Sequence, residues 1–310
     1  MGEPSTSRIG IDLGGTKIAA VALDAAGQVI FEGRVPTPGE YRACLEAIAG
    51  LVAAADEATG VAGFVGVGMP GAISPATGLV KNANSTWLIG HPLDRDLAGV
   101  LGRPVRVMND ANCFALSEAT DGAGAGASIV FGVILGTGVG GGIVVDGKVL
   151  AGAQRIAGEW GHNPLPWAGD DERPGPACYC GRRGCIETFL SGPALAADFL
   201  AATGQDRTPE EIAQAARAGE AAAIAALSRY VDRLGRALAV VVNVLDPDVI
   251  VLGGGVSGLP DLAARARASL EGRVFSDRIV TEVRLNHHGP ASGVRGAAWL
   301  WPTARARSDA

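Results

Sequence analysis

The chain has 310 residues, a formal net charge of −6 at neutral pH and 48% hydrophobic residues. This length favours two lobes over a single core, and the apolar content excludes an intrinsically disordered chain. The negative charge argues against a nucleic-acid-binding surface, so no nucleic-acid partner is expected. No basic and then apolar leader opens the chain, so we expect a cytoplasmic protein in which residues 1–7 form a loose tail.

The first third of the sequence alternates strand and helix patterns. Residues 8–36 hold three strand segments separated by the turns GGT and AAGQ. Residues 41–60 place Leu45, Ile48, Leu51 and Val52 on one helical face. Two further strands are predicted at 62–71 and 104–108, two helices at 92–102 and 112–119, and a long Gly/Pro/Asn loop at 72–92. The predicted order is therefore βββαβαβα.

One uncharged segment has the length of a membrane span. Residues 123–145 contain no charged side chain, which as a helix would cross a bilayer. However, the segment is interrupted by Gly136, Gly138, Gly140, Gly141 and Gly142. Each glycine weakens a helix by roughly 1 kcal/mol, and the flanks are β-branched. We therefore expect two buried strands around a glycine turn, and no membrane partner.

This second hairpin repeats the opening of the chain. After a cysteine-rich loop, helical patterns continue to Val242, and the buried strand DVIVLGGGVS is followed by helix, strand and helix. We predict an α/β protein with two lobes, residues 1–121 and 122–310, and an active-site cleft between them. The last helix is expected to pack back onto the first lobe.

Two glycine motifs can be interpreted only from the residues that follow them. GVGMPG (66–71) and GTGVGG (136–141) both satisfy G-x-G-x-x-G, which opens a helix in dinucleotide-binding units. Here the first runs toward Pro75 and the second into another strand, and no G-x-x-x-x-G-K-[ST] occurs. Two strand–glycine turn–strand elements remain. They are either ordinary tight hairpins or turns whose bare N–H groups approach an anion.

Seven motifs in order resemble the ROK family of bacterial sugar kinases and repressors. They are IGIDLGGTK, GVGMPG, NDANCFALSEA, GTGVGGG, GEWGHNPLP, CYCGRRGCIE and DPDVIVLGGG, and the likeness runs over residues 8–302. It implies the two-lobed, ribonuclease H-like ATPase fold of actin and hexokinase, the use of ATP and Mg²⁺, and a homodimer. Within the family, GLVKNANSTWL and ASGVRGAAWLWP most resemble mannofructokinase, whereas NDANCFALSEA is shared with N-acetylglucosamine kinases.

The resemblance and the turns together suggest the nucleotide-binding residues. Asp12 is a candidate outer ligand of Mg²⁺, Thr16 and Thr137 are candidate hydroxyl donors to phosphate, and Lys17 is either a phosphate ligand or a solvated strand residue. Glycines near the nucleotide would let its groups approach the backbone. The full set is Gly10, Asp12, Gly14, Gly15, Thr16, Lys17, Gly136, Thr137, Gly138, Gly140, Gly254 and Gly255.

Asp110 ends a strand and precedes a helix. One interpretation is a helix N-cap, a position that aspartate fills well. The resemblance favours another, in which Asp110 is the general base that accepts the proton of a sugar hydroxyl. Asn109 would then hold a neighbouring hydroxyl.

Three of the five cysteines lie close together. Cys178, Cys180 and Cys185 form C-x-C-x₄-C, and His162 precedes them by sixteen residues. Cys178 and Cys180 diverge in an extended chain and do not easily bridge each other. Three thiolates and an imidazole make a closed tetrahedral set of the structural zinc type; the alternative is a reduced, metal-free loop. The other two cysteines, in predicted helices, are expected to be small core residues.

Two carboxylates flank these ligands. Glu159 precedes His162 by three residues and Glu187 follows Cys185 by two, so a bound zinc would fix both. Alone, either would more often be a surface charge. In the family, the corresponding Glu, His and Glu positions contact the sugar, the histidine through its second ring nitrogen. Gly71 and Asn84 are weaker candidates for the opposite wall of the sugar pocket.

These residues predict an ATP-dependent hexose kinase that converts fructose to fructose 6-phosphate, with mannose as a second substrate. The alternatives are N-acetylglucosamine or glucose as the sugar. A transcriptional repressor of the family needs an N-terminal DNA-binding domain, for which the eleven residues before Asp12 leave no room. A chaperone-like ATPase or a sugar-binding scaffold would keep the cleft without needing Asp110.

Overall fold

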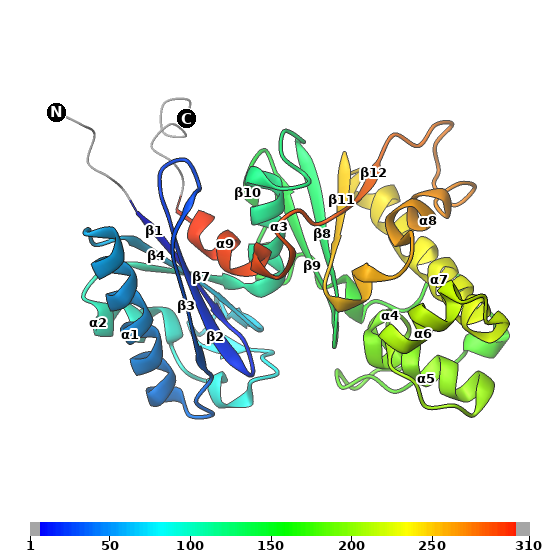
Figure 1. Ribbon diagram of the computed structural model, residues 1–310, viewed down its shortest axis with the longest axis horizontal. Helices are drawn as coiled ribbons and strands as arrows, with labels where there is room; N and C mark the ends of the chain where they lie inside the picture. The colour runs from blue at the N-terminus through cyan, green and yellow to red at the C-terminus, as the bar shows by residue number, and fades with distance from the viewer. Residues whose placement is uncertain (1–6, 302–310) are drawn as a thin grey trace.

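The first lobe is built on a five-stranded sheet. The computed structural model describes residues 7–301, so the predicted tail lies outside the described residues except for Ser7. The strand order is β3-β2-β1-β4-β7, in which β1 pairs antiparallel with β2 and parallel with β4 (Figure 1). The strands are β1 (Arg8–Leu13), β2 (Lys17–Leu23), β3 (Val29–Pro36), β4 (Phe64–Met69) and β7 (Val105–Asn109).

Two helices cover one face of this sheet. They are α1 (Tyr41–Thr59) and α2 (Leu93–Leu101). The four side chains predicted to face inward from α1 are buried, because their spacing places them on one stripe of the helix. They are Leu45, Ile48, Leu51 and Val52. The loop predicted at 72–92 contains more structure than expected: the short hairpin of β5 (Ala72–Ile73) and β6 (Val80–Lys81), and the 3-10 turn η1 (Thr86–Leu88).

The second lobe repeats this plan. Its five strands follow the order β10-β9-β8-β11-β12, again with one antiparallel hairpin followed by parallel neighbours. They are β8 (Ile129–Leu135), β9 (Val139–Val145), β10 (Lys148–Val149), β11 (Val249–Gly253) and β12 (Glu282–Leu285). The uncharged segment at 123–145 is therefore the predicted pair of strands. No helix within residues 7–301 is long and apolar enough to span a membrane.

Helices enclose the far side of the second sheet. The helices are α4 (Glu187–Leu190), α5 (Gly192–Thr203), α6 (Pro209–Arg217), α7 (Ala221–Leu245) and α8 (Leu262–Ala268). The longest, α7, buries Leu227, Tyr230, Leu234 and Leu238 in a core shared with β8 and β11. The predicted run of helices after the cysteine-rich loop is thus confirmed.

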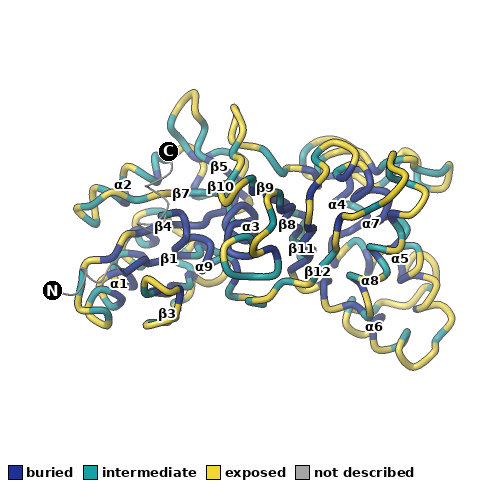
Figure 2. The backbone as a smooth tube through the Cα atoms, turned by 90° about the horizontal axis from the view of Figure 1, so that it is seen from above, coloured by how far each residue is buried: buried dark blue, intermediate teal, exposed yellow. Residues whose placement is uncertain are grey.

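Two helices, α3 (Asp110–Asp121) and α9 (Ser292–Trp299), lie between the sheets (Figures 1 and 2). α3 begins at the end of β7 in the first lobe but packs on β8 and β9, whereas α9 ends the described chain and packs on β1 and β4. The two helices also contact each other. Eight consecutive residues of α3, from Ala111 to Glu118, are buried, as expected for a helix enclosed on all sides.

Glycines allow this close packing. A side-chain carbon added at Gly10 of β1 would strike the backbone of α9 at Val294 O and Ala298 N. At Gly66 of β4 it would strike Ala297 O. The prediction that Gly10 binds nucleotide is therefore corrected: Gly10 is buried inside β1 and gives α9 room to approach the sheet.

Gly10→Ala should destabilise the protein, because the methyl group has no space between β1 and α9. Overpacking of this kind costs about 1–3 kcal/mol, measurable by urea unfolding. Gly99→Ala in α2 is the matched control, since nothing lies within 4 Å of the added carbon. It should stabilise the protein by about 0.5–1 kcal/mol. Wild-type stability in Gly10→Ala would contradict the close packing.

Candidate active site

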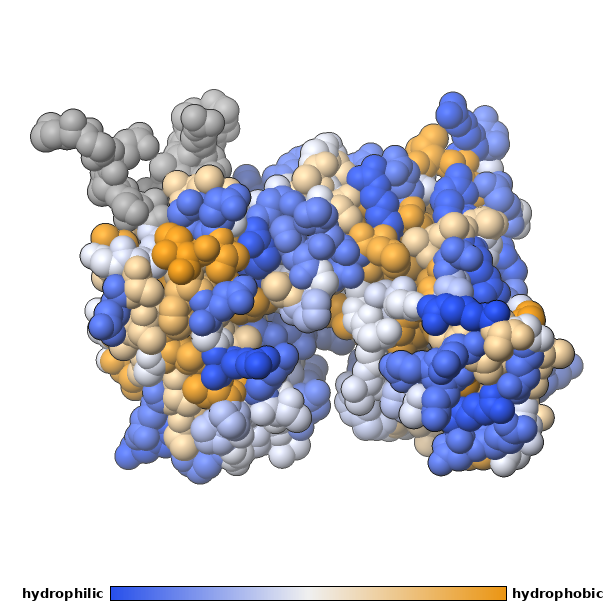
Figure 3. Space-filling view, viewed as in Figure 1, coloured by the Kyte–Doolittle hydropathy of each residue, from blue (hydrophilic) through white to orange (hydrophobic). Residues whose placement is uncertain are grey.

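A cavity opens between the lobes, where Figure 3 shows the molecule hollowed. It holds about 760 Å³ free of protein atoms. The first lobe contributes the residues after β4, β6 and β7, and the second contributes the turn between β8 and β9 and parts of the cysteine-rich segment. The residues around the cavity include Gly71, Asn82, Asn84, Asn109, Asp110, Gly136, Thr137, Gly138, Gly140, Glu159, His162, Tyr179 and Glu187.

Asp110 is the first residue of α3, and Asn109 is its N-cap. Asn109 Oδ1 accepts hydrogen bonds from the backbone N–H groups of Ala111 (2.9 Å) and Asn112 (3.4 Å), and its Nδ2 donates to Gly71 O (3.1 Å). The interpretation of Asp110 as the cap is therefore wrong. Capping occupies the oxygen of Asn109, which leaves one amide proton for a ligand.

The charge environment of Asp110 raises its basicity. Burial, the largest cause, and the nearby carboxylates of Asp12 and Glu159 together raise the pKa of Asp110 to about 6, against the opposing hydrogen bond from Ala111 N–H. Burial likewise raises the pKa of Asp12. A carboxylate with a pKa near 6 is mostly ionised at neutral pH and still takes up a proton readily.

The two glycine turns differ in their relation to the cavity. Gly136, Thr137, Gly138 and Gly140 line it, and the turn is closed by a hydrogen bond from Gly136 N–H to Gly138 O (2.9 Å). The turn at residues 12–17 is closed by Gly14 N–H to Lys17 O (3.1 Å). Its members Gly15, Thr16 and Lys17 are exposed and stand outside the cavity lining.

Gly254 and Gly255 follow β11, beside the end of β8, since Gly253 pairs with Ile134. Gly254 has φ of 86°, and a side chain there would strike the backbone of Leu135. The close approach of Leu135 therefore accounts for the glycine at position 254. Gly255 faces open space and neither residue lines the cavity.

Glu187 is held by the second glycine turn. Its Oε2 accepts a hydrogen bond from Val139 N–H at 2.9 Å. A side chain on Gly138 would come within 2.6 Å of the same oxygen, so it would displace the Glu187 carboxylate from this position. The arrangement couples the turn of β8–β9 to the start of α4, and leaves the other Glu187 oxygen for the cavity. Burial raises the pKa of Glu159 on the same wall.

The cysteines and His162 converge, as their spacing predicted. The four ligand atoms of His162, Cys178, Cys180 and Cys185 all lie within 4.8 Å of one another. Cys180 Sγ is 3.6 Å from Cys185 Sγ, and Cys178 Sγ is 3.6 Å from His162 Nδ1. A tetrahedral zinc with Zn–S bonds of 2.3 Å separates its sulfurs by roughly 3.8 Å. The donor set therefore has the dimensions of a metal site.

A charged network anchors this segment on α7. Glu172 accepts hydrogen bonds from Arg233 Nε (2.8 Å) and Arg236 (2.7 Å), and Arg236 also donates to Pro166 O and Trp167 O. Burial alone would raise the pKa of Glu172, but these arginines lower it to about 2. The segment between His162 and Cys178 is thus tied to the helical core.

Tyr179 is a cavity residue that the sequence analysis missed. Its side chain lies 78% exposed at the cavity, and its Oη is 2.9 Å from His162 Nε2. The nitrogen expected to contact sugar is thus paired with a tyrosine. The signal available in the sequence was the position of Tyr179 between Cys178 and Cys180. If these two cysteines are held in a cluster, the residue between them is held near the same place.

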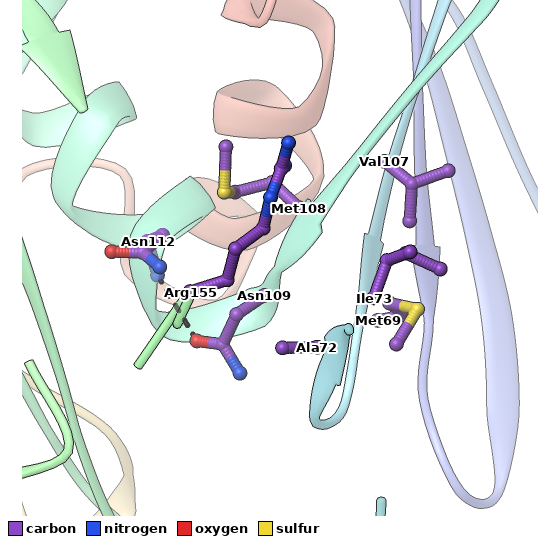
Figure 4. Close-up of a pocket in the computed structure, with 8 residues that line it drawn as sticks. All are labelled: Met69, Ala72, Ile73, Val107, Met108, Asn109, Asn112 and Arg155. Carbon is purple, nitrogen blue, oxygen red and sulfur yellow. Dashed lines mark hydrogen bonds between the residues drawn. The ribbon is translucent and has the colours of Figure 1, made fainter. Parts of the chain in front are cut away.

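A second, smaller recess lies behind Asn109 (Figure 4). About 250 Å³ there is free of protein atoms, counting space open to solvent, and the lining is mostly apolar: Met69, Ala72, Ile73, Val107 and Met108 together with Asn109, Asn112 and Arg155. Arg155 belongs to the second-lobe segment 150–158, which reaches the first lobe. The neighbouring Gln154 O accepts a hydrogen bond from Lys81 Nζ at 2.9 Å.

Two lobes of one repeated plan, with a glycine turn and a half-buried carboxylate at the cleft, define the fold class of the actin- and hexokinase-like ATPases. Residues 8–304 match the ROK family, and the chain belongs to it. It is 41% identical over 297 residues to an N-acetyl-D-glucosamine kinase of Escherichia coli O9:H4 (strain HS), covering 94% of this chain and 98% of that protein.

Solved structures agree with this fold. A ROK hexokinase from Thermus thermophilus is 34% identical with a TM-score of 0.82, covering 94% of this chain and 97% of that one. A ROK family glucokinase from Streptomyces griseus, in complex with glucose and AMPPNP, is 31% identical with a TM-score of 0.75, covering 96% and 99%. The family prediction is confirmed, whereas these relatives do not favour the mannofructokinase branch.

Proposed function

We propose that the protein is an ATP-dependent kinase that phosphorylates N-acetylglucosamine on its primary hydroxyl. This replaces fructose, the first prediction, with the alternative that the motif NDANCFALSEA had suggested. The observation that supports a transfer reaction is the position of Asp110, which is half-buried at a cavity between a glycine turn and a wall of Glu159, His162 and Glu187. The 41% identity to N-acetyl-D-glucosamine kinase favours the acetamido sugar.

The chemistry follows from the charges in the cavity. The sugar hydroxyl donates its proton to Asp110, its oxygen attacks the γ-phosphorus of ATP, and the bond from that phosphorus to the leaving ADP oxygen breaks. Backbone N–H groups of the 136–140 turn and the Thr137 hydroxyl are the candidate phosphate donors on the second lobe. Asp12, near the N-terminus of α9 at Gly293, is the candidate ligand for Mg²⁺ or its waters.

The sugar is assigned to the wall that carries Glu159 and Glu187, beside the turn. Glu159 and Glu187 are acceptors for ring hydroxyls, and Asn84 and Gly71 stand on the first-lobe side of the cavity. Zinc is the metal proposed for His162 and the three cysteines, because three thiolates and an imidazole are typical of structural zinc sites. Such a tetrahedral set is complete and leaves no position for a substrate. Its role is to order the segment that carries these sugar ligands.

A panel of sugars tests this proposal directly. N-acetylglucosamine should give the highest kcat/KM in a coupled ADP-release assay, ahead of glucose, mannose, N-acetylmannosamine and fructose. Glucose is the second candidate, because the similarity to the Streptomyces griseus glucokinase, at 31% identity, extends over 96% of this chain. Sugar-independent ADP release, or none with any of the five, would contradict a sugar kinase.

Asp110→Asn should abolish transfer without unfolding the protein. Loss of a general base costs about 10²–10⁴-fold in kcat, while nucleotide affinity should stay unchanged. In the wild type, kcat/KM should rise with pH through about 6, because the ionised form of Asp110 is the active one. Asn109→Ala is the comparison for stability. It removes the α3 cap, which costs about 1 kcal/mol, whereas Asp110→Asn keeps that cap. Turnover of Asp110→Asn within threefold of wild type would place the base elsewhere.

Metal content tests the cysteine cluster. Protein purified without chelator should contain one zinc per chain by elemental analysis. Cys180→Ser should lower zinc occupancy and thermal stability, and raise the KM for sugar more than the KM for ATP, because it loosens the segment carrying His162 and Glu187. Cys44→Ala, a buried cysteine in α1, should leave the metal content unchanged. A zinc-free wild type would refute the assignment.

A further inference from the structure

Tyr179 lines the cavity, and the proposed function gives it no role. It stands between two cysteines of the cluster, yet its ring lies at the cavity with Asp110, Glu159 and Glu187. It packs edge-on against His162, with ring centroids 5.1 Å apart and an interplanar angle of 86°. Because 78% of the side chain is exposed, its position owes little to burial.

The hydrogen bond between Tyr179 and His162 has a direction. His162 Nδ1 faces Cys178 Sγ, so a metal at the cluster takes the lone pair of Nδ1 and leaves the ring proton on Nε2. Nε2–H then donates to Tyr179 Oη at 2.9 Å. The Tyr179 hydroxyl keeps its own proton and makes no other hydrogen bond within residues 7–301. It is a free donor facing the cavity.

Its neighbours on this wall are of the opposite kind. Glu159 and Glu187 are carboxylates, which when ionised only accept hydrogen bonds. A sugar hydroxyl can donate to them, but the carbonyl oxygen of an acetamido group only accepts and is disfavoured beside a carboxylate. An acetamido sugar therefore needs a neutral donor here, and Tyr179 Oη supplies one.

We propose that Tyr179 recognises the acetamido group of the sugar, its hydroxyl donating to the acetamido carbonyl. The inference rests on the proposed N-acetylglucosamine kinase activity and deepens it. Tyr179 is then a specificity residue: glucose, with a hydroxyl in place of the acetamido group, loses little when the phenol proton is absent. The ring offers the acetyl methyl an apolar surface.

Tyr179→Phe tests this inference because it keeps the ring and removes only the hydroxyl. Calorimetry without nucleotide should show N-acetylglucosamine binding weakened about 2- to 12-fold, the range of one neutral hydrogen bond. Glucose binding should change less than about twofold. Zinc content and melting temperature should match wild type. Tyr41→Phe is the matched control, since it removes a hydroxyl bonded to Asp96 away from the cavity, and it should change neither affinity.

Other outcomes overturn the inference. Tighter binding of both sugars would mean that Tyr179 only occupies His162 until a sugar displaces it. An equal loss for both sugars, unchanged affinity for N-acetylglucosamine, or loss of zinc would each remove the specificity role. A wild type that does not phosphorylate N-acetylglucosamine overturns the proposed function itself. If phosphorylation is intact and the Tyr179→Phe effect is missing, only the role of Tyr179 fails.

Discussion

The structure depends on the approach of helix backbones to strand backbones at glycines. Gly10 and Gly66 let α9 lie directly on the first sheet, and a side chain on Gly132 of β8 or Gly142 of β9 would collide with α3. Each helix thus belongs by sequence to one lobe and packs on the sheet of the other. This exchange makes a single core from residues of both lobes, among them Val21, Phe114, Val130 and Val294. It also fixes where α3 begins, and so where Asp110 stands.

The opposite wall of the cavity is organised by polar contacts instead. The cysteine-rich segment has little regular structure, so its position relies on the converging side chains of His162 and the three cysteines, on Glu172 between two arginines of α7, and on the backbone N–H of Val139 that holds Glu187. Packing therefore positions Asp110, whereas hydrogen bonds and the cluster of His162 with the three cysteines position the segment that carries Glu159 and Glu187. Mutations at the two walls should differ accordingly in their effects on stability and on substrate affinity.

The sequence predicted the elements well because the hydrophobic periods are long and the glycine turns are clear, as in α1 and the β8–β9 hairpin. It failed where distant segments decide. The need for glycine at position 10 comes from Val294, far along the chain. Asn109 and Asp110 are equally good caps by composition, and only the backbone separates them. The spacing of the cysteines and His162 predicted that these side chains converge, but it gave no direction for Tyr179, whose ring is placed by the fold of the loop.

The contact between α3 and α9 has a mechanical consequence. Gly296 brings the backbone of α9 against the carbonyl of Cys113, so no side chain of α9 stands between the two helices there. Interlocked side chains resist sliding because they must climb over one another, whereas a smooth contact resists it less. The contact between α3 and α9 should therefore resist sliding less than a contact of interlocked side chains. If the lobes close over the cavity, we expect them to turn about this contact.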